Sequence, residues 1–218
     1  MKYVGRIVCI GRTQTGKLCA AYRVSSRSFP NRRAVMRDNA ISIIPKPGHE
    51  SDVEKNPYIA YNCARVTCGG KVAVVTNGSQ TDPITEKVAS GMPVRDALAL
   101  SLLALDYEHD QLDTPRICVV ADARGDGACW LAIVRKDGLN VRCVPLAPGH
   151  FQYVATYEEN DLLDTQSGVY EIASAGDACD FLLSGGVFAE RANPVTSVAA
   201  LETDGGFELA AKDAVLPS

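Results

Sequence analysis

The sequence predicts an α+β protein in which two antiparallel sheets pack face to face between outer helices, a four-layer α-β-β-α sandwich. Three observations support this prediction: two hairpins open the chain, two adjacent helices follow, and a series of strands joined by short turns comes next. Short turns connect antiparallel neighbours, and a sheet with an apolar face needs another layer to pack against. No repeat or linker divides the 218 residues, so we expect one domain over residues 1–218.

The first half of the chain begins with apolar runs that are separated by polar turns. The strands predicted from them lie at residues 4–10, 18–24, 40–44, 58–67 and 71–76. A turn at residues 12–17 closes the first hairpin, and Gly69-Gly70 closes the second. Because strand side chains alternate, Tyr58 and Asn62 are expected on one face and Tyr61 on the other.

Two helices are predicted next. Asp82 is the expected N-cap and Pro83 the first helical residue of a helix that ends near Gly91. A second helix runs from residue 93 to about residue 107, and its many leucines and alanines predict burial between neighbouring elements. Three acidic residues within 106–110 end it, although acids at a helix C-terminus oppose the helix dipole and indicate another role.

The second half returns to strands. The predicted strands lie at residues 115–123, 128–135, 139–144, 151–157 and 207–211. A polar loop is expected at 161–168, and helices are expected at 177–183 and, after Pro194, at 193–201.

Composition excludes several classes of protein. A formal net charge of −4 argues against general nucleic-acid binding, and no segment resembles a secretory signal or a membrane span, so we expect a cytoplasmic protein. Eight cysteines lack a Cys-x-x-Cys pair and lie mostly in apolar runs, which is typical of reduced, buried thiols. The three histidines are scattered, so we expect no metal and no cofactor.

An arginine-serine stretch at residues 22–33 is the first candidate binding site. Guanidinium groups and hydroxyls in such a cluster suit a phosphate or a carboxylate, whereas a solvated basic loop is the alternative. A second candidate is Asn77-Gly78-Ser79, where a strand turns into a helix and leaves backbone N–H groups for an anion.

Four motifs together resemble the archaeal-type IMP cyclohydrolases. They are YRVSSRSFPNR at residues 22–32, NPYIAYNC at 56–63, NGS at 77–79 with Thr81-Asp82, and LALDYE at 103–108. The resemblance implies a fold like that of the N-terminal nucleophile hydrolases and the ring closure of 5-formamidoimidazole-4-carboxamide ribotide to IMP with loss of water. The chain begins Met1-Lys2, so we expect that fold without the covalent chemistry of an N-terminal Cys, Ser or Thr.

The resemblance also implies site residues. Tyr61 and Glu108 are the expected catalytic pair, and Arg27 is expected to polarise the formyl oxygen. The predicted substrate-binding residues are Arg23, Ser25, Ser26, Ser28, Asn31, Tyr58, Asn62, Asn77, Gly78 and Ser79. Arg32 and Arg33 carry less weight as solvated loop residues, and alternation leaves open whether Tyr61 or Tyr58 faces the ligand.

The expected partners are one purine ribotide substrate and the IMP product, with no nucleic acid or membrane, and we expect a homo-oligomer. Two other functions remain open at this point. One is a non-catalytic purine-nucleotide-binding module that keeps the anion site. The other is an amidohydrolase of the same fold that uses an internal thiol such as Cys63.

Overall fold

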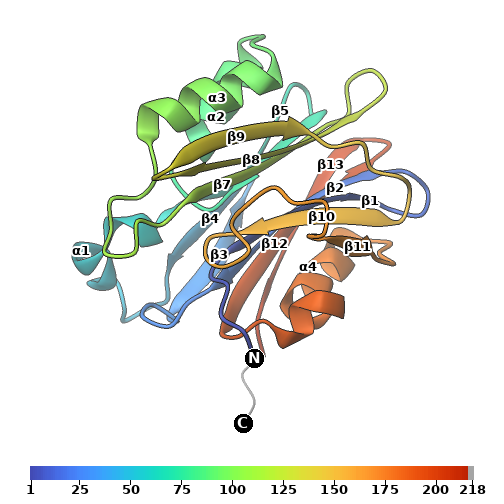
Figure 1. The fold of residues 1–218 in the computed structure, drawn as a ribbon. Coiled ribbons are helices and arrows are strands. Elements are labelled where there is room, and N and C mark those ends of the chain that lie inside the picture. Colours follow the sequence, from blue (N-terminus) through green and yellow to red (C-terminus); the bar gives the residue numbers. More distant parts are fainter. Residues whose placement is uncertain (216–218) are drawn as a thin grey trace.

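Two antiparallel sheets face each other in the computed structural model, which describes residues 1–215 (Figure 1). Residues 216–218 of the predicted domain lie outside the described residues. One sheet has the order β11-β10-β1-β2-β12-β13, and the other has the order β3-β4-β5-β6-β7-β8-β9. The predicted α+β class with two antiparallel sheets is therefore confirmed.

The six-stranded sheet combines the two ends of the chain. Its strands are β1 (Ile7–Arg12), β2 (Leu18–Ser25), β10 (His150–Ala155), β11 (Ser167–Val169), β12 (Pro194–Thr203) and β13 (Gly206–Asp213). The seven-stranded sheet comes from the middle of the chain. Its strands are β3 (Arg32–Arg37), β4 (Ala40–Pro45), β5 (Tyr61–Thr67), β6 (Val72–Thr76), β7 (Arg116–Asp122), β8 (Ala128–Arg135) and β9 (Gly138–Cys143).

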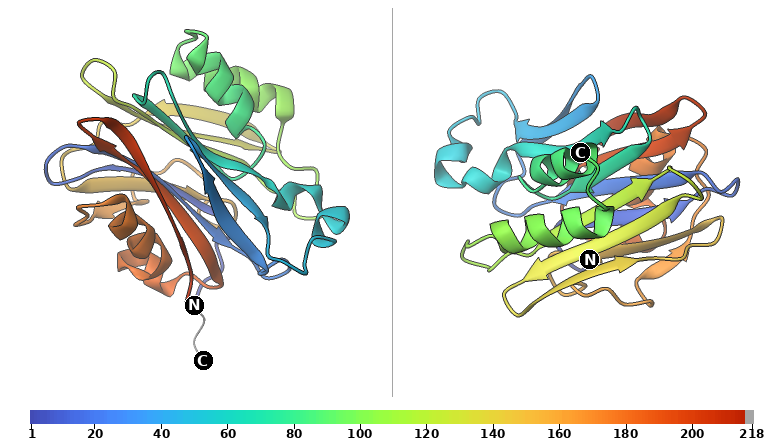
Figure 2. Two further views of the ribbon diagram at one scale, coloured as in Figure 1. Left: turned by 180° about the vertical axis from the view of Figure 1, so that it is seen from behind. Right: turned by 90° about the horizontal axis from the view of Figure 1, so that it is seen from above.

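Helices cover the outer faces of both sheets. Helices α2 (Thr81–Ala89) and α3 (Val94–Leu105) lie on the seven-stranded sheet, and α4 (Ala175–Ser184) lies on the six-stranded sheet (Figures 1 and 2). Short helical turns complete the connections: α1 (Asp52–Lys55), η1 (Pro57–Ile59) and η2 (Gly186–Glu190). Within residues 1–215, no helix is long and apolar enough to cross a membrane.

Three apolar cores follow from the alternation of strand side chains. On β1, Val8 and Ile10 enter the layer between the sheets, whereas Ile7 and Cys9 pack against the α4 side. On β6, the residues between Val72 and Val75 alternate in the same way between the inter-sheet core and the α2–α3 core. Each sheet is thus buried on both faces, which explains why its strands are almost continuously apolar.

The predicted helix at residues 193–201 is wrong, because this segment belongs to β12, an internal strand of the six-stranded sheet. Pro194 followed by several alanines suggested a helix start, but the strand lies between β2 and β13 with both faces covered. Burial on both faces removes the period-two pattern, so the β-branched Val195, Thr196 and Val198 were the remaining signal.

Smaller differences concern other boundaries. Arg32 and Arg33, which were predicted to lie in a loop, begin strand β3, and this strand pairs along its full length with β4. The N-cap of α2 is Gln80, and Asp82 lies inside the first turn. Tyr58 belongs to the helical turn η1 and not to a strand, so the expected placement of Tyr58 and Asn62 on one face of a strand is wrong.

The second predicted helix, α3, is not buried between neighbours. Its inner face packs on β7 and β8 through residues such as Leu98 and Leu102, while Leu100 and Leu103 are 49% and 64% exposed. The many leucines predicted burial on all sides, but the helix packs against only one sheet and exposes its other face.

Helix α4 begins with a capping box, which gives a first test of the local structure. The Ser174 hydroxyl accepts from the Asp177 N–H at 3.1 Å, and the Asp177 carboxylate accepts from the Ser174 N–H at 2.9 Å. We expect Ser174→Ala to lower the free energy of unfolding by about 1 kcal/mol, because one helix N–H loses its acceptor.

Urea unfolding followed by circular dichroism measures this change. Ser184→Ala, at the other end of the same helix and exposed, is the matched control and should change stability by less than about 0.5 kcal/mol. Equal losses in both variants would contradict a specific role for the cap.

Candidate active site

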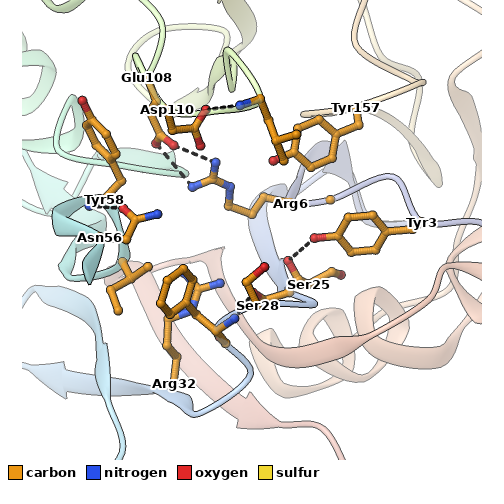
Figure 3. Close-up of a pocket in the computed structure, with 15 residues that line it drawn as sticks. Tyr3, Arg6, Ser25, Ser28, Arg32, Asn56, Tyr58, Glu108, Asp110 and Tyr157 are labelled. Atoms are coloured by element: carbon orange, nitrogen blue, oxygen red, sulfur yellow. Dashed lines mark hydrogen bonds and ion pairs between the residues drawn. The ribbon is translucent and has the colours of Figure 1, made fainter. Parts of the chain in front are cut away.

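A polar pocket opens where segments from both sheets meet (Figure 3). Its walls come from the segment before β1, the loop after β2, the start of β3, the turn before β5, the loop after α3 and the residue after β10. The lining residues are Tyr3, Gly5, Arg6, Ser25, Ser26, Ser28, Phe29, Arg32, Asn56, Tyr58, Ile59, Glu108, Asp110, Leu112 and Tyr157.

A buried ion pair between Arg6 and Glu108 lies at the centre of this pocket. The Arg6 Nη2 and Nη1 atoms donate to the two carboxylate oxygens of Glu108 at 2.8 and 3.3 Å. Arg6 is 8% exposed and Glu108 only 1%. Figure 3 shows the Arg6 side chain extending across the pocket to Glu108. Such a fork fixes the orientation of both groups.

A main-chain hydrogen bond also holds Glu108 in place. Helix α3 ends at Leu105, and its C-cap Asp106 has a φ of 57°. Two residues later, the Glu108 N–H donates to the Thr114 carbonyl at 2.8 Å. The acids at the end of α3 therefore have the other role that the sequence indicated: at least one of them is a buried partner of an arginine.

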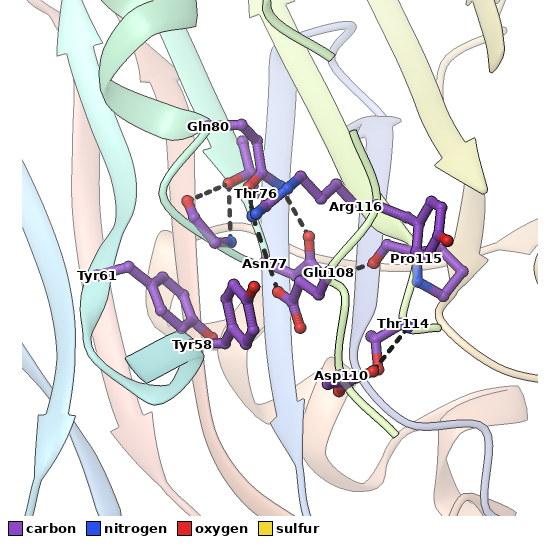
Figure 4. A network of polar contacts seen from close by, with 12 residues as sticks. Tyr58, Tyr61, Thr76, Asn77, Gln80, Glu108, Asp110, Thr114, Pro115 and Arg116 are labelled. Atoms are coloured by element: carbon purple, nitrogen blue, oxygen red, sulfur yellow. Dashed lines mark hydrogen bonds and ion pairs between the residues drawn. The ribbon is translucent and has the colours of Figure 1, made fainter. Parts of the chain in front are cut away.

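A second arginine supports the same carboxylate from behind (Figure 4). Arg116 Nη1 lies 3.9 Å from Glu108 Oε1 and donates to Gln80 Oε1 at 3.1 Å, and Gln80 donates in turn to Asn77 Oδ1 at 2.8 Å. Gly78 adjoins this chain of contacts, since a Cβ there would lie 2.7 Å from Gln80 Oε1. Only glycine fits at this position without displacing the network.

Arg6 remains protonated in this environment. Burial alone would lower the pKa of Arg6, but the charge of Glu108, together with nearby tyrosine hydroxyls, outweighs it and raises the pKa well above its usual value. The pocket therefore contains a permanent cation paired with a carboxylate.

Arg32 supplies a second positive charge that no carboxylate neutralises. It is 3% exposed and lines the pocket, and its Nε donates to the Phe29 carbonyl at 3.0 Å. Among residues 1–215, neither an ion pair nor another hydrogen bond engages its guanidinium. The expectation that Arg32 is a solvated loop residue is wrong, and its free N–H groups suit an anion or a carbonyl oxygen.

Tyr58 and Tyr61 both lie near the pair, in different settings. Tyr58 projects from η1 into the pocket, where the Arg116 guanidinium lies 5.7 Å from its ring centre. Tyr61 on β5, the predicted catalytic tyrosine, is not among the lining residues. It is 8% exposed and extends between the sheets, with its hydroxyl 2.6 Å from that of Tyr22. Burial raises the pKa of Tyr61, while the charges of Arg32 and Arg6 oppose the rise.

The family of this chain follows from a comparison with known proteins. Residues 3–206 match the model of the IMP cyclohydrolase-like protein family. The chain belongs to this family.

Full-length relatives agree with this membership. The chain is 45% identical over 202 residues to an IMP cyclohydrolase of Methanosphaera stadtmanae, covering 93% of this chain and 95% of the relative. It is 57% identical over 158 residues to one of Methanocella arvoryzae, covering 72% and 75% of the two chains. A Methanocaldococcus jannaschii IMP cyclohydrolase is 40% identical over 216 residues, covering 96% and 98%. The resemblance noted from the motifs is confirmed.

The arginine-serine motif of this IMP cyclohydrolase-like protein divides between pocket and scaffold. Ser25, Ser26 and Ser28 line the pocket. Arg27 is exposed at its rim, with its guanidinium carbon 4.0 Å from the ring centre of Tyr3. Asn31 is half-buried outside the lining, where its carbonyl accepts from Lys46 N.

Arg23 on β2 is not among the pocket-lining residues, although it was a predicted substrate ligand. It is fully buried, and its guanidinium donates to the carbonyls of Leu182 and Phe188 at 3.0 Å and of Arg191 at 2.5 Å. Burial lowers the pKa of Arg23 to about 10. These contacts make Arg23 a clamp for the end of α4 and for η2. Its Nε also donates to Ser25 Oγ at 3.0 Å, so Arg23 supports a lining residue without lining the pocket itself.

The other predicted ligands also lie outside the pocket lining. Asn62 faces α2 and donates to the Asp82 carboxylate at 3.0 Å. Asn77 is fully buried in the network behind Glu108, and the Gly78 N–H already donates to Thr76 Oγ1 at 3.2 Å. Ser79 is exposed outside the lining. The expected anion cradle at this turn therefore serves as support for Glu108.

The thiol of Cys63 is unsuited to nucleophilic chemistry. It is fully buried in the inter-sheet core, its Sγ contacts the Ile41 carbonyl at 3.3 Å, and burial raises its pKa. Among the eight cysteines, which are all free, only Cys143 is exposed. The prediction of mostly buried cysteines is confirmed.

Several pocket residues were missed from the sequence. For Arg6 the sequence contained an indication of its role, because a charged residue inside the apolar run of residues 4–10 needs a charged partner when it is buried. Tyr3, Asp110 and Tyr157 had none, since they come together only through folding: Tyr157 follows a strand of one sheet, and its hydroxyl lies 3.0 Å from Thr114 Oγ1 in the loop that leads into the other.

The placement of Arg23 gives a second prediction. We expect Arg23→Met to lower the free energy of unfolding by about 3 kcal/mol, because several buried carbonyls lose a charged donor. The KM of the folded protein should not change. Chemical unfolding and steady-state kinetics measure the two effects.

Arg37→Met, an exposed arginine at the end of β3, is the control and should leave stability and KM unchanged. A large rise in KM at unchanged stability for Arg23→Met would instead place Arg23 in substrate binding.

Proposed function

We propose that this protein, an IMP cyclohydrolase in purine biosynthesis, closes its substrate's second ring in the pocket formed by Arg6, Glu108 and Arg32. The observation that carries the proposal is the arrangement of charge. A buried Arg6–Glu108 ion pair faces a second buried arginine that has no carboxylate partner within residues 1–215, and tyrosines and serines line the space between. Such a site offers both acceptors and donors to a neutral amide and a formyl group.

The reaction makes one bond and breaks another within a single molecule. The carboxamide nitrogen of 5-formamidoimidazole-4-carboxamide ribotide attacks the formyl carbon, and the carbonyl electron pair moves to the formyl oxygen. The substrate nitrogens lose two protons in all, and the oxygen leaves with two as water. Because both reacting groups belong to one molecule, positioning supplies much of the rate.

We assign to Glu108 the orientation and deprotonation of the attacking nitrogen. Its carboxylate is held by Arg6 and supported by Arg116, so it can only accept hydrogen bonds. A carboxamide N–H directed at it is oriented for attack, and the proton is then taken by the carboxylate directly or through a water. Arg6, fixed beside it, is assigned to the negative charge that develops on the formyl oxygen.

Tyr61 is assigned to protonation of the departing oxygen. Its raised pKa keeps the hydroxyl protonated at neutral pH, so it can donate. The charges of Arg32 and Arg6 favour the phenolate that forms when the proton leaves. Tyr58, which lines the pocket, is assigned to contact with the planar base.

We assign the binding of the ribotide's anionic end to Arg32 and to the serine loop, residues 25–28. Ser25, Ser26 and Ser28 lie in the same wall as Arg32, and the Ser26 hydroxyl turns the loop by accepting from Phe29 N at 3.0 Å. A phosphate matches a guanidinium whose terminal N–H groups face the pocket. Arg27 at the rim adds positive charge where the ligand enters.

We also infer that the fold is that of the N-terminal nucleophile hydrolases and that residues 1–218 act as one domain. The α-β-β-α order of layers supports the first inference. The cytoplasmic location and the homo-oligomer expected from the sequence stay predictions.

The catalytic assignment predicts a specific loss of activity. We expect purified protein to form IMP from the formylated ribotide in an absorbance assay, and Glu108→Gln and Tyr61→Phe each to lower kcat by roughly 10²- to 10³-fold. Circular dichroism must show that both variants are folded, since Glu108 is a buried partner of Arg6.

Glu171→Gln, an exposed glutamate after β11, is the matched control and should retain wild-type kcat. No rate above background for the wild-type protein would refute the proposed reaction. Wild-type kcat in both variants would leave the reaction standing and refute the assigned residues.

The assignment of Arg32 predicts a loss of binding. Arg32→Met should raise KM and the Kd of IMP by roughly 10- to 100-fold, because the anion loses a charge-assisted donor, with a smaller effect on kcat. Calorimetric titration with IMP measures the affinity directly. Arg33→Met, the exposed neighbour on the same strand, should bind IMP like wild type, and equal losses in the two variants would indicate a general charge effect.

A further inference from the structure

Tyr22 and Tyr61 form a buried hydroxyl pair that joins the two sheets. Tyr22 projects from β2 of the six-stranded sheet and Tyr61 from β5 of the seven-stranded sheet, and their oxygens lie 2.6 Å apart. Both side chains belong to the inter-sheet core, and both lie within the fields of Arg6 and Arg32. The role proposed for Tyr61 does not by itself explain a second tyrosine here.

The direction of this hydrogen bond follows from counting partners. Tyr22 is 0% exposed, and within residues 1–215 its hydroxyl has no hydrogen-bond partner except Tyr61. If Tyr61 were the donor, the Tyr22 proton would be buried without an acceptor, which costs free energy. Tyr22 is therefore the donor, and the Tyr61 oxygen is the acceptor.

This direction leaves the Tyr61 proton free for another partner. Tyr61 is not itself a lining residue, but it lies close enough to Arg6, which lines the pocket, for their charges to interact, and it retains 8% exposure. A ligand or a water bound at Arg6 is therefore the partner that its O–H can reach. Burial, followed by the neighbouring Tyr61, raises the pKa of Tyr22 well above its usual value, which is consistent with a hydroxyl that stays protonated and donates.

We propose that Tyr22 is a positioning residue that donates a hydrogen bond to the Tyr61 oxygen, so that the Tyr61 proton points at the substrate and the resulting phenolate is stabilised. This inference rests on the proposed function, in which Tyr61 protonates the departing oxygen. When the Tyr61 O–H bond breaks, the proton goes to the formyl-derived oxygen and the electron pair stays on the phenolate. One of the protons given up by the substrate nitrogens restores the phenol, so the net product is one water.

Tyr22→Phe keeps the ring and removes only the hydroxyl, so it isolates this contact. We expect kcat to fall on the order of tenfold, the loss of one hydrogen bond to a developing charge, with KM changed less than about twofold. In the Tyr61→Phe background the second substitution should have no further effect, because the two hydroxyls act as one unit.

Tyr170→Phe is the matched control for loss of a buried hydroxyl. Tyr170 is 3% exposed in the α4-side core, and its hydroxyl has no hydrogen-bond partner among residues 1–215. It should retain wild-type kcat. Wild-type kcat for Tyr22→Phe, or a loss that adds fully to that of Tyr61→Phe, would overturn the proposal.

A titration tests the same contact without any turnover. A fluorinated tyrosine in place of Tyr61 brings the phenol pKa into a measurable range, and ¹⁹F NMR follows its ionisation. Tyr22→Phe should raise that pKa, because the phenolate loses a donor, whereas Tyr170→Phe should leave it unchanged. An unchanged titration in Tyr22→Phe would overturn the proposal.

The two readouts separate this inference from the proposed function. Absence of IMP formation by wild-type protein would refute the reaction, while the ¹⁹F titration would still decide whether Tyr22 donates to Tyr61. If Tyr22→Phe does not fold, a fluorinated tyrosine in place of Tyr22 keeps the ring and is a stronger donor. It should then lower the pKa of the position-61 phenol, and no change would count against the proposal.

Discussion

The buried ion pair between Arg6 and Glu108 is the interaction on which the site depends. Two opposite charges this deep in a protein are stable only when each is paired and further hydrogen-bonded, and removal of one partner leaves the other uncompensated. Neighbouring residues supply these further contacts. Arg116 lies beside the carboxylate, Gln80 accepts a hydrogen bond from Arg116, and Gly78 leaves room for both side chains. Arg6 comes from the chain before β1 and Glu108 from the loop after α3, so the pair also ties the two sheets together at the pocket.

The inter-sheet layer adds a second polar contact beside this pair. In a layer otherwise filled with Val, Ile, Leu, Ala and Cys side chains, the hydroxyls of Tyr22 and Tyr61 form a hydrogen bond between the two sheets. Each ring buries apolar area on its own sheet, and the single hydrogen bond uses the Tyr22 proton and leaves the Tyr61 proton for another partner. The core that holds the sheets together thus also sets the direction of a hydroxyl at the pocket.

Sequence patterns were sufficient where local physics dominates. The hairpin of β1 and β2, the adjacent helices α2 and α3, and the hairpins from β7 to β9 follow from apolar runs and turn residues, and the structure agrees. They failed for β12, because a strand covered on both faces loses its alternation and then resembles an alanine-rich helix. They also failed for Arg32, because a basic residue after a proline is buried only when a neighbouring strand and a pocket wall enclose it.

The sequence by itself determined the family, the two-sheet architecture and the serine loop with the two tyrosines and Glu108, since these reside in contiguous motifs or in local periodicity. Only the tertiary structure decided which of those side chains share a pocket. Arg23 and Ser25 are two residues apart on one strand, yet Arg23 clamps the end of α4 while Ser25 lines the cavity. Arg6 and Glu108, a hundred residues apart, form its central pair. The reason is physical: partners for buried charge are selected by proximity in the folded chain, and spacing along the sequence does not encode that proximity.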